Sequence, residues 1–544
     1  MSIGPYTYEE YINLIKSFHG SAAPGMIIGG FMVDLALNNL PEGEFFDAVC
    51  ETRSCLPDAI QLLTPCTIGN GWLTIENLGR YALSLFEKYS GNGVRVWVDS
   101  EKVENWPEIK SWFFKLKPKR EQDSKALYEQ IEEAGAGILS MEPVQVKPRY
   151  IGRKGKGAIA CCPLCNEAYP RNNGAICLAC QGRSPYETQS TDKGLQEHKR
   201  PQLKVVPVEG IEGKKLLHDM TRILPGKEKG PAFRKDQVVT AGDICRLQQM
   251  GRQNIYVKEQ LLDEQEWVHE DDAATAFAKA MAGEGVVLSG SPKEGKVNMA
   301  ASQDGLCMVD RDRIEQFNLL PGVMCASIHD CSVIAKDTQF AGTRAIPLYL
   351  SRVDFDNAMS VLEDGPIFSV LPMRKAKVGI LVTGTEVFKG LIEDSFAPII
   401  TEKVESFGCS VVESIIVADD ASAIRDAVKK LLDLGADMII TTAGLSVDPD
   451  DLTRQGLEDA GLSDMLYGAP VLPGAMTLIG TIGDVQVIGV PACALYYKTT
   501  AFDIILPRLL AGLKIARKDL ARLGHGSYCL NCSTCLYPQC SFGK

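Results

Sequence analysis

Four cysteines in the first third of the chain have the residue type and spacing of a metal site. Cys162 and Cys165 form one C-x2-C pair, and Cys177 and Cys180 form a second pair after eleven intervening residues. Two such pairs supply four thiolates to one tetrahedral ion, and zinc is the usual occupant. Because four thiolates close the coordination sphere, we expect this site to fold a small module, with a redox disulfide pair as the alternative.

A second cysteine cluster lies near the C-terminal end of the sequence. Cys529, Cys532 and Cys535 follow one another at C-x2-C-x2-C spacing, and Cys540 comes after four further residues. Three cysteines at this spacing fit three corners of a [4Fe–4S] cluster, with Cys540 as the fourth ligand. Four thiolates also fit one zinc ion, so zinc and an iron–sulfur cluster both remain open for this tail.

The N-terminal segment contains a third set of ligand types at looser spacing. His19, Cys55, Asp58 and Cys66 offer an imidazole, two thiols and a carboxylate, which could bind one metal ion together. The alternative is that the thiols are buried in a core and that Asp58 caps a helix. Of the four residues, we predict His19 and Cys55 as metal ligands.

Two loops rich in glycine and hydroxyl groups follow apolar runs in the C-terminal third. Residues 378–382 and 437–441 read as buried parallel strands, and each run breaks into such a loop. Backbone N–H groups, hydroxyls and helix N-termini at the carboxyl ends of strands suit a phosphate or another oxyanion. The predicted binding residues in these loops are Thr383, Gly384, Thr385, Thr442, Gly444 and Ser446.

Carboxylates are frequent in the same loops. Side chains of this kind beside a phosphate-binding loop suit a hard divalent ion such as Mg²⁺. The alternative is helix capping, because several of them precede or open a predicted helix. The acidic residues concerned are Glu386, Asp394, Asp419, Asp420, Asp448, Asp450 and Asp451.

The elements around these loops predict a doubly wound fold. Helical patterns cover residues 392–407 and 420–434, and residues 410–417 between them form a strand pattern. Strands that alternate with helices form a parallel sheet, and ligands bind at the carboxyl ends of its strands. We therefore predict an α/β multidomain chain with an N-terminal α+β domain and zinc module, a β-rich middle region and a C-terminal doubly wound α/β domain.

Length and composition restrict the class of protein. A chain of 544 residues is long enough for roughly three to four domains. The net charge of −12 argues against nucleic-acid binding, which needs basic surfaces. No apolar run reaches the length of a membrane span, and no basic-then-apolar signal pattern opens the sequence, so we expect a cytoplasmic protein without a membrane partner. The 18 cysteines then indicate metal binding more than a disulfide framework.

Residues 10 to about 180 resemble the E-subunit family of formylmethanofuran dehydrogenase. The resemblance rests on His19-Gly20, on Pro24-Gly25 and on the pattern around Cys55 and Asp58 that continues through Gln61 and Cys66 to Gly71. The family also has a second histidine and a cysteine in its first motif, where this chain has Ser21 and Ala23. The resemblance implies a degenerate copy of the first motif, followed by the zinc module that ends many members of that family.

Residues 203 to about 515 resemble the molybdopterin molybdenumtransferases, the gephyrin-like proteins of molybdenum cofactor synthesis. The matching residues are His218-Asp219, Thr221-Arg222, Phe233 to Lys235, Thr383-Gly384, Glu386, Asp394-Ser395, Asp419-Asp420, Thr442 to Val447, Asp451, Gly489 to Pro491 and Pro507-Arg508. The resemblance implies binding of molybdopterin, either free or adenylylated, together with Mg²⁺ and molybdate or tungstate, and release of AMP.

Roles for individual residues follow from this second resemblance. It implies that Asp451 binds the divalent ion, that Glu386 and Asp394 take part in catalysis, and that Ser395 and Asp420 line the cofactor site with the loop hydroxyls. This chain has Thr385 where the family has an aspartate, and Asp448 where it has a glycine.

The two resemblances together imply a fusion. We expect a protein that handles the molybdenum or tungsten cofactor and inserts or delivers molybdate or tungstate for a formate- or formylmethanofuran-type dehydrogenase, as a homodimer. A non-catalytic pterin-binding chaperone, or a redox or metal sensor that docks on such an enzyme, is the alternative. The predicted parts are an E-subunit-like domain (1–150), the zinc module (151–185), a linker (186–202), a molybdenumtransferase-like β-rich region (203–375), a molybdopterin-binding domain (376–515) and a cysteine-rich metal-binding tail (516–544).

Overall fold

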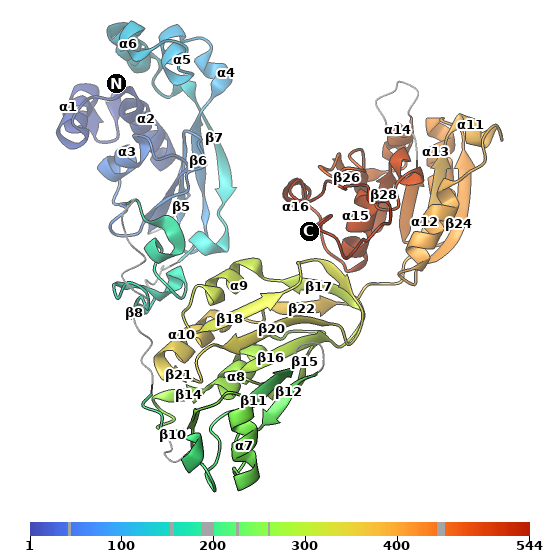
Figure 1. Cartoon of the computed structure of the whole chain (residues 1–544). Helices are drawn as coiled ribbons and strands as arrows, with labels where there is room; N and C mark the ends of the chain where they lie inside the picture. Colours follow the sequence, from blue (N-terminus) through green and yellow to red (C-terminus); the bar gives the residue numbers. More distant parts are fainter. Residues whose placement is uncertain (42–44, 153–156, 187–200, 225–227, 259–261, 443–451) are drawn as a thin grey trace. The chain divides into compact units, whose positions relative to one another are not determined.

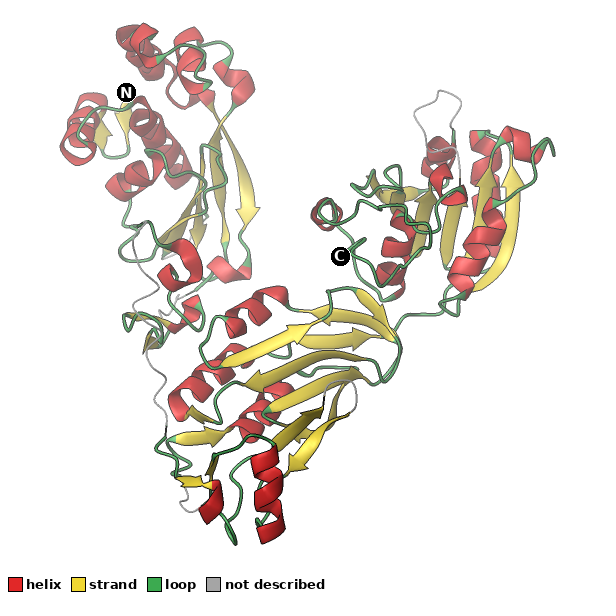
Figure 2. Ribbon diagram, viewed as in Figure 1, coloured by secondary structure: helices red, strands yellow, loops and turns green. Residues whose placement is uncertain are grey.

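The computed structural model describes residues 1–41, 45–152, 157–186, 201–224, 228–258, 262–442 and 452–544. The chain divides into two compact units, Met1–Lys156 and Gly157–Lys544. Both units combine helices with sheets, which confirms the predicted mixed α/β multidomain fold (Figures 1 and 2).

The first unit is an α+β domain built on one five-stranded sheet of order β4-β3-β5-β6-β7. Strands β3 and β4 are parallel, and the other neighbours are antiparallel. The strands are β1 (Ser2–Ile3), β2 (Tyr6–Thr7), β3 (Phe46–Cys50), β4 (Leu73–Ile75), β5 (Ala82–Glu87), β6 (Asn92–Val98) and β7 (Leu139–Gln145). The helices are α1 (Tyr8–His19), α2 (Pro24–Asn38), α3 (Leu56–Leu63), α4 (Ser100–Val103), α5 (Pro107–Phe113) and α6 (Ser124–Ala134).

Helix α2 is the buried centre of this unit. It packs on β5 and β6, and all of its residues from Gly25 to Val33 are buried. Glycine at Gly30 permits the close approach of α1, since a Cβ there would lie 2.4 Å from the Tyr11 ring. Within the described residues, no single helix is long and apolar enough to cross a membrane, and the pair α1 and α2 passes that test only when joined across a bend of 120°.

The second unit begins with a small hairpin of β8 (Ile159–Cys161) and β9 (Ala168–Pro170) and continues into a β-rich region. That region contains a four-stranded antiparallel sheet of order β15-β16-β20-β18 and a three-stranded sheet of order β19-β17-β22. Its helices are α7 (Ala241–Gln249), α8 (Glu270–Met281), α9 (Arg311–Asn318) and α10 (Arg352–Leu362). Its strands are β10 (Val205–Pro207), β11 (Met220–Leu224), β12 (Glu228–Phe233), β13 (Asn254–Tyr256), β14 (Trp267–His269), β15 (Val286–Lys293), β16 (Lys296–Ala301), β17 (Gly305–Val309), β18 (Val323–Ser327), β19 (Ser332–Ile334), β20 (Gln339–Ala345), β21 (Tyr349–Ser351) and β22 (Phe368–Leu371).

A buried carboxyl group at the start of α8 should make this region sensitive to pH. Glu270 is 8% exposed, and burial, followed by the charge of Asp271, raises its pKa to about 7. The folded chain therefore holds this proton more tightly than the unfolded chain, whose glutamate pKa is 4.5. Since the unfolded state loses its proton first, the stability of the region falls as pH rises from about 4.5 to about 7, by an amount on the order of 3 kcal/mol.

The variant Glu270→Gln should remove this pH dependence and be more stable than wild type at pH 8, because an amide carries no proton to lose. Thermal unfolding of both proteins across this pH range measures the difference. Equal pH slopes for the two proteins would show that Glu270 is not the titrating group.

The C-terminal domain is organised on a six-stranded sheet of order β24-β23-β25-β28-β27-β26. The four strands β24, β23, β25 and β28 are parallel, as predicted for the apolar runs, and the hairpin of β26 and β27 adds an antiparallel edge. The strands are β23 (Lys377–Thr383), β24 (Ser410–Val417), β25 (Met438–Thr442), β26 (Leu462–Tyr467), β27 (Leu478–Ile482) and β28 (Val485–Val490). The helices are α11 (Thr385–Phe388), α12 (Phe396–Glu405), α13 (Ala421–Asp433), α14 (Thr453–Asp459), α15 (Ala501–Leu510) and α16 (Arg517–Arg522).

Helices cover both faces of this sheet (Figure 2). On β23, Ile380 and Val382 belong to the hydrophobic cluster that contains α12 and α15, while Leu381 belongs to the cluster that contains α13 and α14. Alternate side chains of a strand point to opposite faces, so a continuous apolar run is needed when both faces are covered. This arrangement leaves the carboxyl ends of the parallel strands as the place for polar side chains.

Candidate functional site

The ends of β23 and β25 meet at one edge of the C-terminal sheet. Val382 lies opposite Thr442 in the parallel register. The next residue, Thr383, donates a hydrogen bond from Oγ1 to the backbone carbonyl of Thr442 at 3.0 Å. Its Oγ1 also lies 2.8 Å from Oγ1 of Thr453 at the start of α14. The Thr383 hydroxyl therefore joins three segments at the edge where both predicted loops begin.

Two further threonine hydroxyls are buried next to these contacts of Thr383. Thr441 and Thr442 are both fully buried, and neither Oγ1 has a hydrogen-bond partner among the described residues. A buried hydroxyl without a partner costs stability, typically about 1–3 kcal/mol. Thr442 is the last residue of β25, so it lies at the carboxyl edge of the sheet.

The loop after β23 is held by Asp419. Gly384 has φ of 151°, a backbone conformation that favours glycine, and it leads directly into α11. The Asp419 carboxylate accepts hydrogen bonds from the backbone N–H of Thr385 at 2.9 Å and from its Oγ1 at 3.3 Å. The backbone N–H of Thr385, which was predicted to bind an oxyanion, is thus already hydrogen-bonded to the carboxylate of Asp419.

Two of the predicted acidic residues cap helices. The Asp394 carboxylate accepts from the backbone N–H of Phe396 at 2.8 Å and from that of Ala397, at the start of α12. Asp420 caps α13 and accepts from the backbone N–H of Ala423 at 2.8 Å. The hydrogen bond from Ser422 Oγ, followed by the one from Ala423, lowers the pKa of Asp420. The capping alternative describes both residues, and their roles in catalysis and cofactor binding stay predictions.

The remaining predicted residues of this edge fall into two groups. Glu386 on α11 and Ser395 before α12 are both exposed, so solvent or a ligand can reach them. Gly444, Ser446 and Asp451 lie outside the described residues, and their roles stay predictions.

The four-cysteine module has the geometry of a single-ion site. The ligand atoms of Cys162, Cys165, Cys177 and Cys180 all lie within 4.8 Å of one another. The first pair stands at the turn of the hairpin of β8 and β9, and the second pair leads into a short helical turn at Ala179–Arg183. Thiolates 2.3 Å from one zinc ion are at most about 4.6 Å apart, so this spacing fits zinc.

Backbone N–H groups prepare this site for thiolates. The backbone N–H of Cys177 donates to the Cys162 sulfur at 3.4 Å. Burial opposes ionisation of Cys162, but hydrogen bonds from the backbone of Cys177, Cys165 and Leu164 outweigh it and lower its pKa to about 7. N–H donors to sulfur stabilise the charged form, which is the form that binds zinc.

His19 and Cys55 approach each other in the first unit. Cys55 Sγ lies 3.9 Å from His19 Nε2, and His19 Nδ1 lies 2.7 Å from Asp58 Oδ2. A zinc ion with ligands at about 2.3 and 2.1 Å brings sulfur and nitrogen to a similar separation, so the two predicted ligands fit one ion. Asp58 then orients the imidazole through its other nitrogen, as carboxylates do around metal-binding histidines. Cys66 is fully buried and its Sγ faces the Phe46 carbonyl, so it does not join them.

This arrangement predicts unequal effects of two substitutions on a second, weaker metal site. In a variant whose four tail cysteines are replaced by serine and whose four-cysteine module already holds zinc, added Co²⁺ should bind at His19 and Cys55 and give a thiolate charge-transfer band. Cys55→Ala should abolish that band, and Asp58→Asn should weaken Co²⁺ affinity by about 10–100-fold, because it removes the group that orients the imidazole. A titration curve that Cys55→Ala leaves unchanged would exclude this site.

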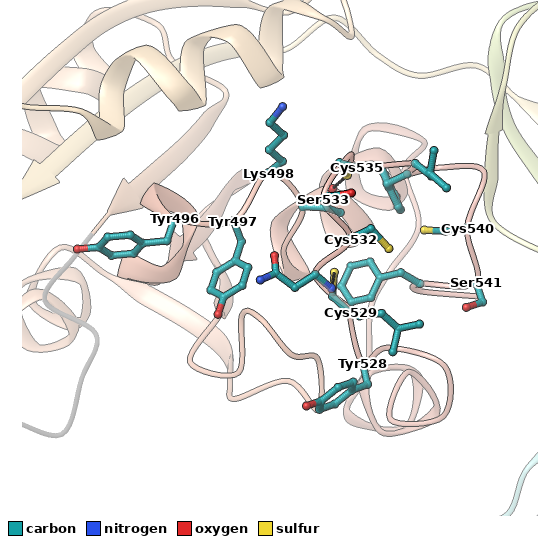
Figure 3. Close-up of a pocket in the computed structure, with 16 residues that line it drawn as sticks. Tyr496, Tyr497, Lys498, Tyr528, Cys529, Cys532, Ser533, Cys535, Cys540 and Ser541 are labelled. Atoms are coloured by element: carbon teal, nitrogen blue, oxygen red, sulfur yellow. Dashed lines mark hydrogen bonds between the residues drawn. The ribbon is translucent and has the colours of Figure 1, made fainter.

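The predicted tail ligands Cys529, Cys532, Cys535 and Cys540 differ from the four-cysteine module. Among the described residues, the four thiols of the module converge within 4.8 Å of one another. No three of the tail thiols lie that close together. They instead line a cavity together with residues 496–499, which follow β28 (Figure 3). Residues 496–499 were not predicted from the sequence, although Tyr496, Tyr497 and Lys498 follow the end of an apolar strand run as the other loops do.

Family models match most parts of the chain. Residues 18–147 match the family described as FmdE, molybdenum formylmethanofuran dehydrogenase operon, and residues 153–187 match the FmdE treble clef zinc finger. Residues 379–511 match the family described as probable molybdopterin binding domain. Residues 205–259 match a domain of unknown function, and the molybdenumtransferase resemblance of the middle region stays a prediction.

Individual relatives cover single parts of the chain. A tungsten formylmethanofuran dehydrogenase FmdE-like protein from Syntrophus aciditrophicus, of known crystal structure, is 55% identical and covers 34% of this chain and 97% of that chain, with a TM-score of 0.32. A probable S-adenosyl-L-methionine-binding protein from Archaeoglobus fulgidus is 32% identical over 194 residues, which are 31% of this chain and 51% of that protein. A CinA-like protein from Mycobacterium avium is 36% identical over 78 residues, which are 14% of this chain and 18% of that protein.

The chain thus spans about half of the Archaeoglobus relative (51%) and less than a fifth of the Mycobacterium relative (18%). The family matches agree with the zinc geometry and with the parallel sheet described above. The chain is a fusion that joins an FmdE-family domain and its treble-clef zinc finger to a C-terminal domain of the probable molybdopterin-binding family.

Proposed function

We propose that this protein binds molybdopterin at the carboxyl edge of its C-terminal sheet and delivers molybdate or tungstate to it, for a formate- or formylmethanofuran-type dehydrogenase. A function related to the molybdenum or tungsten cofactor is supported by both family matches. The proposal adds the delivery role, a client enzyme of that class, a homodimer and a cytoplasmic location, all of which are expectations from the sequence.

One observation carries the proposal. Thr383 ties the ends of β23 and β25 together through its bond to the Thr442 carbonyl, so both hydroxyl-rich loops start from one rigid point. The Thr442 hydroxyl at this point is buried and has no partner among the described residues. A rigid edge with an unsatisfied hydroxyl suits a ligand rich in oxygen atoms, such as the phosphate of a pterin.

The acidic residues would supply the rest of the site. In this proposal Asp451 holds Mg²⁺, and the exposed Glu386 contributes a second carboxylate. Mg²⁺ when bound would neutralise charge on the phosphate groups of an adenylylated pterin. Thr383 keeps the loops in position, and Thr385 is itself positioned by Asp419, so the chain's own part is orientation more than proton transfer.

A second candidate function is a chaperone that binds molybdopterin without turnover. The specific observation in its favour is that Asp394 and Asp420 serve as helix caps, while Asp419 occupies the N–H group of Thr385. These contacts use three carboxylates within the fold, which leaves fewer for a metal ion.

One experiment separates the two functions. The full chain is incubated with adenylylated molybdopterin, Mg²⁺ and molybdate or tungstate, and AMP is measured over time. AMP release that Asp451→Ala abolishes supports metal insertion, whereas tight pterin binding without AMP release supports the chaperone. Absence of both binding and AMP release would contradict the proposal, and Asp433→Ala, at the last residue of α13, is the control for loss of an acidic side chain.

A further inference from the structure

The cysteine-rich tail is docked on the C-terminal domain through specific contacts. The backbone N–H of Cys529 donates to the Leu472 carbonyl at 2.8 Å, and the Leu472 N–H donates to the Ser527 carbonyl at 2.9 Å. Tyr537 donates from its hydroxyl to the Asp503 carbonyl of α15 at 3.1 Å. Phe542 is 4% exposed in the hydrophobic cluster that contains α15. The tail is therefore folded against this domain and is part of its structure.

The docked tail encloses a cavity of about 240 Å³ (Figure 3). The walls come from the tail on one side and from the segment after β28 on the other, and all four tail cysteines line it with Tyr497 and Lys498. None of the family models that match the chain extends over residues 512–544. The cavity is thus a feature to which no family match assigns a ligand.

The spacing of the tail thiols distinguishes between the two metals that the sequence left open. Thiolates that bind one zinc ion at 2.3 Å lie at most about 4.6 Å apart. The thiols of the four-cysteine module all lie within 4.8 Å of one another, close to this limit, whereas no three of the tail thiols, all of which the structure describes, do so. A cubic iron–sulfur cluster holds its thiolates farther apart, because each thiolate binds a different iron. The tail thiols, which are spread around a cavity, therefore fit an iron–sulfur cluster. The thiols of the four-cysteine module, which converge, fit a single zinc ion.

The polar groups of the cavity fit an anionic cluster. Cys535 Sγ lies 3.2 Å from Thr499 Oγ1, within hydrogen-bond distance of this hydroxyl. Lys498 lines the same cavity, with its ammonium group pointing away from the thiols (Figure 3). Hydrogen bonds to the sulfurs are a usual means by which a protein stabilises such a cluster.

We propose that the cavity of the tail holds one [4Fe–4S] cluster, with one iron bound by each of Cys529, Cys532, Cys535 and Cys540. The inference goes beyond the proposed function, since the cluster site stands next to the segment after β28 and requires no pterin. It selects the cluster over zinc for the same C-x2-C-x2-C-x4-C run.

Anaerobic reconstitution of the full chain with ferrous iron and sulfide tests this site. We expect about four irons and four sulfides per chain in addition to the zinc, with thiolate-to-iron absorption that bleaches on reduction by dithionite. Cys532→Ala and Cys540→Ala should each lower the iron content to less than about one per chain. The half-buried Cys493, between β28 and residues 496–499, does not line the cavity, so Cys493→Ala should keep the full content.

Two results would overturn the proposal. One is a second zinc ion per chain that Cys532→Ala removes, with no uptake of iron and sulfide by the wild type. The other is iron uptake that all three alanine variants retain equally. Neither readout depends on molybdopterin, so failure of the cluster and failure of the proposed function can be told apart.

Discussion

Cys177→Ala is expected to release the zinc ion from the four-cysteine module and to unfold that module. Cys177 is buried, and its sulfur belongs to the group of four thiols that converge within 4.8 Å. Zinc sites of this kind contribute apparent binding free energies of roughly 10–16 kcal/mol, and that energy is folding energy because the site does not exist in the unfolded chain. Metal analysis should show the loss of about one zinc per chain, and limited proteolysis should cut within residues 157–183.

The neighbouring Cys161 is the matched control for this prediction. Its thiol is exposed and is not part of the converging group. Cys161→Ala should therefore keep the zinc and the resistance to proteolysis. A Cys177→Ala protein that retains its zinc would show that the ion, if bound, is held elsewhere.

Thr383→Val is expected to destabilise the C-terminal domain by about 2–4 kcal/mol, because two buried partners lose their hydrogen bond. Valine has nearly the shape of threonine, so the change removes the bond to the Thr442 carbonyl and the contact with Thr453 Oγ1 without leaving a large cavity. Hydrogen exchange of the amides in β23 and β25 measures the effect on this domain by itself. The same variant should bind molybdopterin more weakly, since the two loops lose their common anchor.

Thr441→Val provides the isosteric control on the adjacent strand. Thr441 is also fully buried, but its hydroxyl has no partner among the residues that the structure describes. Its replacement by valine should leave stability within about 1 kcal/mol of wild type or raise it, because a buried hydroxyl without a partner is removed. Equal destabilisation by Thr383→Val and Thr441→Val would show that the hydrogen bonds of Thr383 do not stabilise this edge of the sheet.

The parallel edge of the C-terminal domain could be predicted from the sequence because its signals are local. A continuous apolar run that ends in hydroxyl residues describes a strand covered on both faces, and the predicted runs 378–382 and 437–441 coincide with β23 and β25 to within one residue at each end. The two C-x2-C pairs that begin at Cys162 and Cys177 could be predicted as one metal site for the same reason, because their spacing along the chain brings the four thiols together. The antiparallel edge of β26 and β27 was not predicted. The apolar runs of these two strands are shorter, and each strand forms by pairing with its neighbour in the sheet.

The use of individual polar groups could not be read from the sequence. The helix predicted from residue 392 begins at Phe396, because Asp394 binds the first N–H groups of α12. Whether a carboxylate caps a helix or binds a ligand depends on the direction of one side chain, which residue spacing does not determine. The cavity of the tail likewise depends on contacts between distant segments, such as that of Cys535 with Thr499.

The measurement that tests the central claim most directly is the equilibrium binding of molybdopterin to the full chain and to its Thr442→Val variant. Thr442 is buried, and its Oγ1 has no partner in the described part of the chain, so the variant should fold as wild type does. We predict that the wild type binds molybdopterin and that the variant binds it at least about tenfold more weakly, which corresponds to about 1.4 kcal/mol. A wild type that binds no molybdopterin, or a variant that binds it with unchanged affinity, would contradict the proposal that the ends of β23 and β25 hold this cofactor.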